Sequence, residues 1–168
     1  LVRALSAAQV EAATAGAGWG GVLVCIPAFN EAESLPAVLA EIPAEVAGLR
    51  THVLVIDDGS SDDSFGIAQR YRDPRLHVER NARNLGLVEN WNQALQRVAT
   101  PFFALCHSDD IYEAGFLGRL LELLHNHPGA FIAHSRTWSI DQNDRISWMP
   151  HEAYKDQYQT TSRDHVTL

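Results

Sequence analysis

Two pairs of adjacent aspartates stand shortly behind apolar segments of the sequence. Asp109 and Asp110 follow the apolar run 102–106, and a second pair, Asp57 and Asp58, follows another such run. Paired carboxylates offer the oxygen ligands that a hard divalent cation such as Mg²⁺ or Mn²⁺ prefers, and such a cation can neutralise a diphosphate. The alternative is a structural role, because Asp is also common in turns and at the N-cap of a helix.

Short apolar runs and helical stripes alternate along the chain and predict how these acids are positioned. The runs predict strands at residues 21–26, 52–56, 76–79, 102–106 and 130–133. Helical spacing of apolar side chains predicts helices over 35–46, 65–71, 88–98 and 116–124, with Pro43 ending or kinking the first. This alternation is typical of an α/β fold with three α/β/α layers around a mostly parallel sheet. The loops after Ile26, Ile56 and Cys106 should therefore meet at one edge of the sheet, where such folds bind ligands.

The ends of the chain depart from this pattern. Residues 1–20 are alanine-rich and then glycine-rich, which predicts an N-terminal helix through Ala17 and a linker outside the main fold. The glycines precede a strand, so they do not form a dinucleotide fingerprint, which follows one. Residues 136–140 and 145–148 flank a turn signal at 141–144 and predict two short strands, and 151–168 form a polar tail.

Composition excludes several classes of protein. The chain has 168 residues, which favours a single domain, and a net charge of −8. An acidic chain lacks the basic surface that nucleic-acid binding requires. No apolar run approaches the roughly 18 residues of a membrane-spanning helix.

Four segments in order resemble the family 2 glycosyltransferases, which have the GT-A fold (nucleotide-diphospho-sugar transferase-like). They are residues 26–31 (IPAFNE), 55–62 (VIDDGSSD), 84–87 (NLGL) with Trp91 and Asn92, and 107–110 (HSDD). Each segment alone is a weak signal, but the four together span most of the predicted sheet. The resemblance implies a nucleotide-sugar-binding domain over residues 21–150, with the tail 151–168 as the start of a truncated acceptor region.

The resemblance also implies a donor site. The loop after the first strand would cradle the base and ribose, with Phe29 beside the base, and Asp57 would accept a hydrogen bond from the ring N–H of uracil or thymine. Arg83 or Asn84 would contact the base or a phosphate. The implied nucleotide-sugar-binding residues are Pro27, Phe29, Glu31, Asp57, Asp58, Arg83, Asn84 and Asp109.

A metal site follows from the same resemblance. Asp109 and Asp110 would hold Mg²⁺ or Mn²⁺ against the donor diphosphate, and His107 stands where many relatives have the first aspartate of this motif. The family inverts the anomeric carbon by direct displacement, with a carboxylate general base on the acceptor hydroxyl. Relatives have this base well beyond the metal motif, in the acceptor half, and no residue of this sequence is assigned to it.

The implied enzyme is an inverting, hexosyltransferase-like glycosyltransferase (EC 2.4) of bacterial polysaccharide synthesis. Its donor would be a UDP or TDP sugar, and its acceptor a saccharide or a lipid-linked sugar. We expect a cytoplasmic protein, with the inner face of the membrane as the alternative place, and a homodimer as one alternative oligomeric state. The sugar and the acceptor are left open.

Other functions are weighed against this one. A degenerate or truncated nucleotide-sugar-binding module without catalysis is the main alternative. An aspartyl-phosphate phosphotransferase needs an acid, one spacer, a second acid and an essential lysine, whereas the acids here are adjacent and the only lysine is Lys155. A sugar nucleotidyltransferase needs a glycine- and arginine-rich loop after the first strand, which this sequence lacks.

The two cysteines, Cys25 and Cys106, lie near the ends of apolar runs. Two cysteines make no disulfide framework, so buried, reduced thiols and a cytosolic setting are favoured. The GT-A resemblance makes the two strands neighbours, so the thiols should also lie close together.

Overall fold

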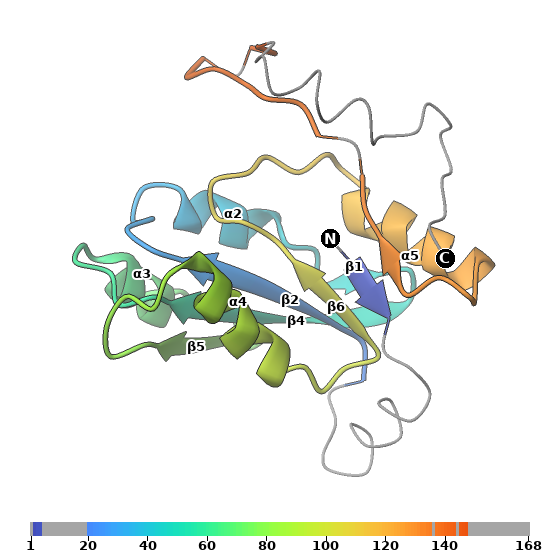
Figure 1. Cartoon of the computed structure of the whole chain (residues 1–168), viewed down its shortest axis with the longest axis horizontal. Coiled ribbons are helices and arrows are strands. Elements are labelled where there is room, and N and C mark those ends of the chain that lie inside the picture. The colour runs from blue at the N-terminus through green and yellow to red at the C-terminus, as the bar shows by residue number, and fades with distance from the viewer. Residues whose placement is uncertain (1, 5–19, 136, 144, 148–168) are drawn as a thin grey trace.

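The computed structural model describes residues 2–4, 20–135, 137–143 and 145–147 (Figure 1). In this part of the chain the strands are β1 (Val2–Ala4), β2 (Val22–Ala28), β3 (Glu45–Val46), β4 (Leu49–Asp57), β5 (Leu76–Arg80), β6 (Phe102–Leu105) and β7 (Ile132–Ala133). The helices are α2 (Leu35–Glu41), α3 (Ser64–Arg70), α4 (Leu87–Gln96) and α5 (Phe116–Asn126). Within these residues no helix has the length and hydropathy needed to cross a membrane.

The strands form one mixed sheet in the order β3-β4-β2-β6-β1-β7, with β5 paired to the other part of β4. The central strand β2 is buried along its whole length and is parallel to both neighbours, with Val24 opposite Val53 of β4 and Ala104 of β6. Since β2, β4, β5 and β6 run in the same direction, their carboxyl ends meet at one edge. The predicted mostly parallel sheet is confirmed, and so is the meeting of the three polar loops.

Side chains alternate between the two faces of the sheet and divide the core into two layers. Val24 and Ile26 pack in a large cluster with buried side chains of α2, α3 and α5. Leu23 and Cys25 pack on the opposite face with Ala94 of α4. Figure 1 shows α4 crossing this second face of the strands. The expected α/β/α arrangement is therefore confirmed.

The N-terminal segment corrects one prediction. Residues Val2–Ala4 form a strand, not a helix outside the fold, and β1 pairs antiparallel with both β6 and β7. Its backbone groups supply hydrogen-bond partners to two strands that would otherwise present open edges. The alanine stripe gave no sign of this long-range pairing. The rest of the expected N-terminal helix and linker, through residue 19, and the tail 151–168 lie outside the described residues.

The segment after α2 corrects a second prediction, namely that the helix continues to Val46. Helix α2 ends at Glu41, as the prediction for Pro43 requires, because the residue before a proline avoids the helical region. Val46 therefore does not extend the helix but lies in β3, opposite Leu49. The hairpin turn needs a positive φ at both central residues, Ala47 (51°) and Gly48 (76°).

The two short strands expected at 136–140 and 145–148 are represented in the described residues by a single antiparallel bridge between Ile140 and Ile146. The predicted turn between them is present. The carboxylate of Asp141 accepts the backbone N–H groups of Asn143 at 2.8 Å and Arg145 at 3.1 Å. The hydrogen bond from Arg145 has the largest effect on the pKa of Asp141 and, with the bond from Asn143, outweighs desolvation, so this pKa is lowered.

Candidate functional site

The loop after β2 is tied to the loop after β4 by hydrogen bonds between their backbones and short polar side chains. The N–H of Asn30 donates to the hydroxyl of Ser60 at 2.9 Å, and the amide oxygen of Asn30 accepts the N–H of Ser61 at 2.8 Å. The N–H of Glu31 donates to the hydroxyl of Ser64 at 2.7 Å. Asn30 has a φ of 58°, a left-handed conformation that Asn tolerates better than most residues. The two loops therefore form one wall at the strand edge.

Two predicted donor-binding residues, Phe29 and Glu31, belong to the first of these loops, whereas the third, Pro27, lies in β2, which extends two residues beyond the predicted end of the strand. Pro27 is buried within β2, and its carbonyl accepts the hydroxyl of Ser108 at 3.4 Å. Phe29 is 43% exposed at the rim. The carboxylate of Glu31 accepts the hydroxyl of Ser34 at 2.5 Å. Of the three, Phe29 is the side chain with apolar surface open to a ligand.

Asp57, the last residue of β4, is fully buried and half satisfied. Its Oδ2 forms an ion pair with Nε of Arg80 at 3.0 Å and accepts the N–H of Ser60 at 3.2 Å. No described residue donates to its Oδ1, which is also buried. A buried acceptor without a partner costs about 1–3 kcal/mol, so this oxygen is available to accept a further hydrogen bond.

Arg80 holds Asp57 in place from the neighbouring strand β5. The two residues are opposite each other in the parallel register. The guanidinium also donates to the carbonyl of Ser60 at 2.6 Å, and it lies 5.1 Å from the centroid of the Phe65 ring. Its position is thus defined by three contacts besides the backbone pairing.

Asp58, although also buried, uses its carboxylate within the protein. Oδ1 accepts Nδ2 of Asn81 at 2.8 Å and the N–H of Leu85 at 2.9 Å, and Oδ2 accepts the N–H of Gly86 at 2.9 Å. These bonds clamp the loop that leads into α4. Asp58 is adjacent to Asp57 in the sequence, but both of its carboxylate oxygens accept hydrogen bonds from that loop and its flanking residues.

The clamped loop carries Arg83 and Asn84, two further predicted binding residues. It packs so closely on Gly59 that a Cβ there would lie 2.6 Å from the carbonyl carbon of Arg83 and 2.8 Å from the nitrogen of Asn84. Gly59 also has a φ of +70°, which disfavours other residues. Arg83 is exposed and makes no ion pair within the described residues. Asn84 accepts the N–H of Gly86 at 2.7 Å.

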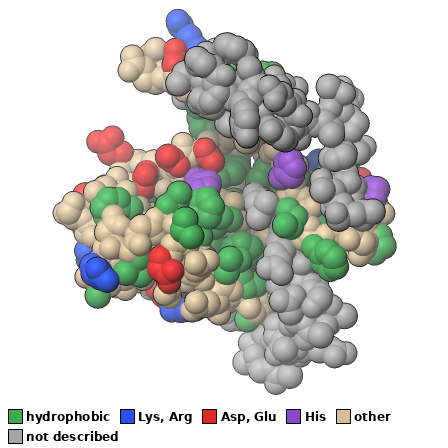
Figure 2. Space-filling model, in the orientation of Figure 1, with side chains coloured by type: hydrophobic (Ala, Val, Ile, Leu, Met, Phe, Trp, Pro, Cys, Tyr) green, Lys and Arg blue, Asp and Glu red, His purple; other side chains and the backbone are tan. Residues whose placement is uncertain are grey.

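Asp109 and Asp110 lie exposed on the turn after β6, and Ser108, just before them, donates its hydroxyl to the carbonyl of Pro27 at the end of β2. Figure 2 shows carboxylates gathered beside a histidine, on the side where β2 and β6 end. Neither acid caps α5, which begins at Phe116 with Gly115 at its N-cap, so the cap alternative is wrong here. It is also wrong for the first pair, because the N-cap of α3 is Asp63.

The donor set of this turn fits one kind of metal site. Among the described residues no three His, Cys, Asp or Glu side chains are grouped to hold an ion by themselves. Mg²⁺ and similar ions, however, are commonly held by one or two carboxylates together with water and substrate phosphates. The two exposed carboxylates suit that mode.

His107, the first residue of this turn, contacts α4: the centroid of its ring lies 5.1 Å from that of Trp91, at an interplanar angle of 55°.

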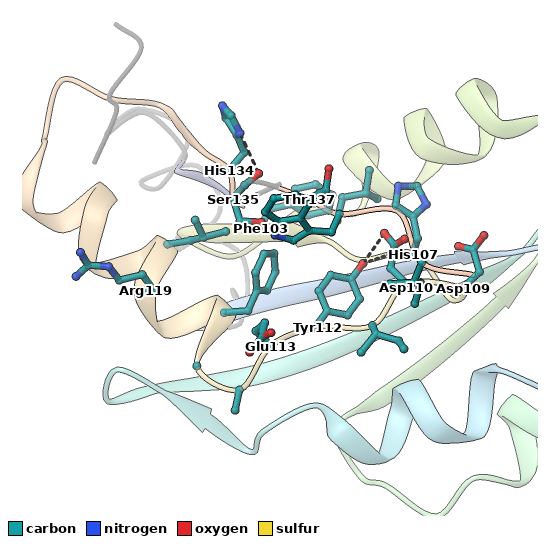
Figure 3. Close-up of a pocket in the computed structure, with 18 of the residues that line it drawn as sticks. Phe103, His107, Asp109, Asp110, Tyr112, Glu113, Arg119, His134, Ser135 and Thr137 are labelled. Atoms are coloured by element: carbon teal, nitrogen blue, oxygen red, sulfur yellow. Dashed lines mark hydrogen bonds between the residues drawn. The ribbon is translucent and has the colours of Figure 1, made fainter. Parts of the chain in front are cut away.

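A groove of about 1320 Å³ opens beside this turn. Figure 3 shows Asp109 and Asp110 near one end and Arg119 at the other. Its walls come from α4, β6, the turn, α5 and the segment after β7, with apolar surface from Phe103 and Trp138. Trp91 is half-buried and lines the groove, and its indole nitrogen is buried without a hydrogen-bond partner in the described residues.

Both cysteines are free and buried, as predicted. Their strands are neighbours, and the N–H of Cys106 donates to the carbonyl of Cys25 at 2.9 Å. The thiols nevertheless pack in different core clusters, on opposite faces of the sheet. Burial raises the pKa of both thiols, that of Cys106 to about 11.

Sequence reasoning missed several residues that build the site. Arg80 lies on a short strand whose register cannot be read from composition. Asn90 is buried on α4, where its side chain donates to the carbonyl of Ile56 at 3.1 Å and accepts from Asn81 at 3.1 Å. A signal did exist for Asn90, because it shares the buried side of the helix with Ala94. Tyr112, beside the turn 107–110, carried no such signal.

Comparison with known proteins gives three results. The sequence profile described as glycosyl transferase family 2 matches residues 23–167. The succinoglycan biosynthesis protein ExoU of Rhizobium meliloti is 35% identical over 102 residues, which cover 60% of this chain and 29% of that protein. Glucosyl-3-phosphoglycerate synthase from Mycobacterium tuberculosis, crystallised with Mn²⁺, UDP and glucosyl-3-phosphoglycerate, is similar with a TM-score of 0.55 and 25% identity.

That structural similarity covers 75% of this chain and 46% of the synthase. S. aureus TarS in complex with UDP-GlcNAc is similar over 64% of this chain and 32% of TarS, with a TM-score of 0.53 and 25% identity. The matches cover 29–42% of the length of the curated relatives in which they extend over about 100 residues.

Proposed function

The chain belongs to glycosyl transferase family 2, and from this premise we propose that it forms the donor-binding part of an inverting glycosyltransferase. The proposed reaction moves a sugar from a UDP or TDP donor to an acceptor hydroxyl, with inversion at the anomeric carbon. Asp57 reads the base, Phe29 packs beside it, and Arg83 and Asn84 contact the base or diphosphate. Asp58 contributes by holding the loop that carries the last two.

One observation carries the choice of base. Oδ1 of Asp57 is a buried acceptor without a partner, at the edge where the loops meet. Its neighbour Oδ2 is held by Arg80, so the free oxygen has a defined direction. Uracil and thymine present a ring N–H at N3, whereas cytosine presents a lone pair at the same atom. A carboxylate accepts hydrogen bonds and donates none, so it favours the first two bases.

Asp109 and Asp110 are proposed to hold Mg²⁺ or Mn²⁺. When bound there, the ion supplies charge neutralisation for the departing nucleoside diphosphate. Two carboxylates near a diphosphate repel it, by about 4 kcal/mol per charge pair at 4 Å in an effective dielectric of 20. Mn²⁺ and UDP in the crystals of glucosyl-3-phosphoglycerate synthase support this assignment.

The acceptor is proposed to be a saccharide or a lipid-linked sugar in the synthesis of a bacterial polysaccharide. The similarity to a succinoglycan biosynthesis protein supports this class. Such an acceptor would be met in the cytoplasm or at the inner face of the membrane. No described residue is assigned as the general base.

Calorimetric titration with UDP and CDP tests the assignment of Asp57. The wild type should bind UDP about tenfold or more tightly than CDP, since a hydrogen bond to a charged group is worth about 1.5–3 kcal/mol. Asp57→Asn, whose amide can donate to cytosine, should erase this preference. Asp63→Asn is the matched control, because Asp63 is an exposed acid paired with Arg70 at 2.6 Å in the same region. Equal affinities of the wild type for UDP and CDP would refute the proposed donor class.

A further inference from the structure

The phenol of Tyr112 lies beside the turn that carries the two exposed aspartates (Figure 3). Its hydroxyl accepts the backbone N–H of His107 at 2.6 Å and donates to Oδ2 of Asp110 at 3.4 Å. A phenol has one hydrogen to donate and lone pairs to accept with, so both bonds can exist together. One hydroxyl thus connects the first and last residues of the turn 107–110.

The ring of Tyr112 is anchored independently of these bonds. It is half-buried, packs against the core, and lies 5.0 Å from the ring of Phe116 in the first turn of α5. The hydroxyl is therefore held at a defined position by apolar contacts. Among the described residues no other side chain hydrogen-bonds Asp109 or Asp110.

Exposed carboxylates normally rotate freely and must be ordered when they bind an ion, which lowers affinity. The bond from Tyr112 limits this freedom for Asp110 before any ligand arrives. The stronger bond, to the N–H of His107, limits the backbone of the turn that presents both acids. Hydrogen bonds of this kind to metal-binding side chains change metal affinity by about 10–100-fold in other proteins.

We propose that Tyr112 is a positioning residue for the cation and diphosphate: its hydroxyl preorganises the turn 107–110 so that Asp110 is directed toward the bound ion. This inference rests on the proposed function, because it requires a divalent cation at Asp109 and Asp110. It assigns a role to a residue outside the four sequence segments that resemble the family. Tyr112 contacts neither sugar nor base in this assignment and acts through Asp110 and the backbone of His107.

Tyr112→Phe tests the proposal, since it removes the hydroxyl and keeps the ring against Phe116. UDP affinity is measured by calorimetry with and without Mn²⁺ in the wild type and the variant. The gain in UDP affinity caused by Mn²⁺ should fall about tenfold in Tyr112→Phe, while UDP affinity without Mn²⁺ stays the same. Amide hydrogen exchange of residues 107–110 should become faster. Tyr71→Phe, which removes a phenol hydroxyl at the end of α3, is the matched control and should change none of these values.

A double-mutant cycle asks whether Tyr112 acts through Asp110. In the Asp110→Ala background, Tyr112→Phe should lower the Mn²⁺-dependent gain by a clearly smaller factor than it does in the wild type. Equal factors in both backgrounds would overturn the proposed connection.

The remaining outcomes separate this inference from the proposed function. An unchanged Mn²⁺-dependent gain in Tyr112→Phe overturns the role of Tyr112 and leaves the metal assignment intact. An equal loss of UDP affinity with and without Mn²⁺ also overturns it, because it indicates a general structural effect. A wild type whose UDP affinity does not respond to Mn²⁺ refutes the metal-assisted function, and the role of Tyr112 falls with it.

Discussion

Two pairs of aspartates stand at the same edge of the sheet, and their surroundings are opposite. Asp57 and Asp58 are buried, and their carboxylates receive donors from β5, the clamped loop and the backbone. Asp109 and Asp110 are exposed, and Tyr112 is the one described side chain that hydrogen-bonds either of them.

The difference follows from the cost of burying charge. A buried carboxylate must find partners within the fold, or the folded state is destabilised by several kcal/mol. The first pair is therefore part of the structure as well as of the proposed site. An exposed carboxylate stays hydrated, needs no partner within the fold, and is therefore available to bind a ligand. Two predictions test this contrast, a third concerns the exposed acid Asp62 in the loop after β4, and the two already given for Asp57 and Tyr112 test the contrast at single atoms.

The largest effect is expected for Asp58→Ala. The change leaves the donors of Asn81, Leu85 and Gly86 without their acceptor at a buried position, so the free energy of unfolding should fall by about 3 kcal/mol or more. Urea denaturation measures it. Asp63→Ala is the control, because an exposed ion pair contributes only about 0–1 kcal/mol. Similar losses in the two variants would contradict the structural role of Asp58.

The second prediction is a change in ligand binding without a change in the stability of the fold. Asp109→Ala should change the free energy of unfolding by no more than about 0.5 kcal/mol, as is usual for surface substitutions. It should nevertheless abolish the effect of Mn²⁺ on UDP affinity, and Asp110→Ala should weaken that effect less. Calorimetry and urea denaturation of the same samples provide both values. A stability loss with an unchanged response to Mn²⁺ would make this turn structural, like the first pair.

The smallest effect is expected on the pH dependence of stability, through the side chain of Asp62. Desolvation raises the pKa of Asp62, but the stronger combined effect of hydrogen bonds from Ser64 and the N–H of Ala32 lowers it. A lowered pKa in the folded state means that the stabilisation is complete above the unfolded pKa, near 3.9, and is lost as pH falls through the folded value. The wild type should therefore lose slightly more stability than Asp62→Asn between pH 5 and pH 3. Identical losses in urea denaturation would contradict this.

Much of the fold could be predicted from the sequence because its signals are local. Strands β2, β4 and β6 are short apolar runs, and α5 has a strong apolar stripe, so period and length identify them. The failures are non-local or depend on one turn. β1 is a strand because it pairs with residues about a hundred positions away. Val46 lies in β3 and not in the predicted helix, because Pro43 prevents the helix from continuing and a tight turn then reverses the chain.

The sequence by itself determined that two acidic pairs follow buried strands. In a parallel sheet this is sufficient to bring them to one edge, since equal strand direction puts equal ends together. Only the tertiary structure decided what each acid does there. The register of β5 puts Arg80 opposite Asp57, the loop before α4 occupies Asp58, and the packing of Tyr112 on Phe116 directs a hydroxyl to Asp110. A hydrogen bond forms only when donor and acceptor lie at the right distance to within a few tenths of an ångström. Residue types in the sequence do not specify how closely segments far apart in the chain approach each other.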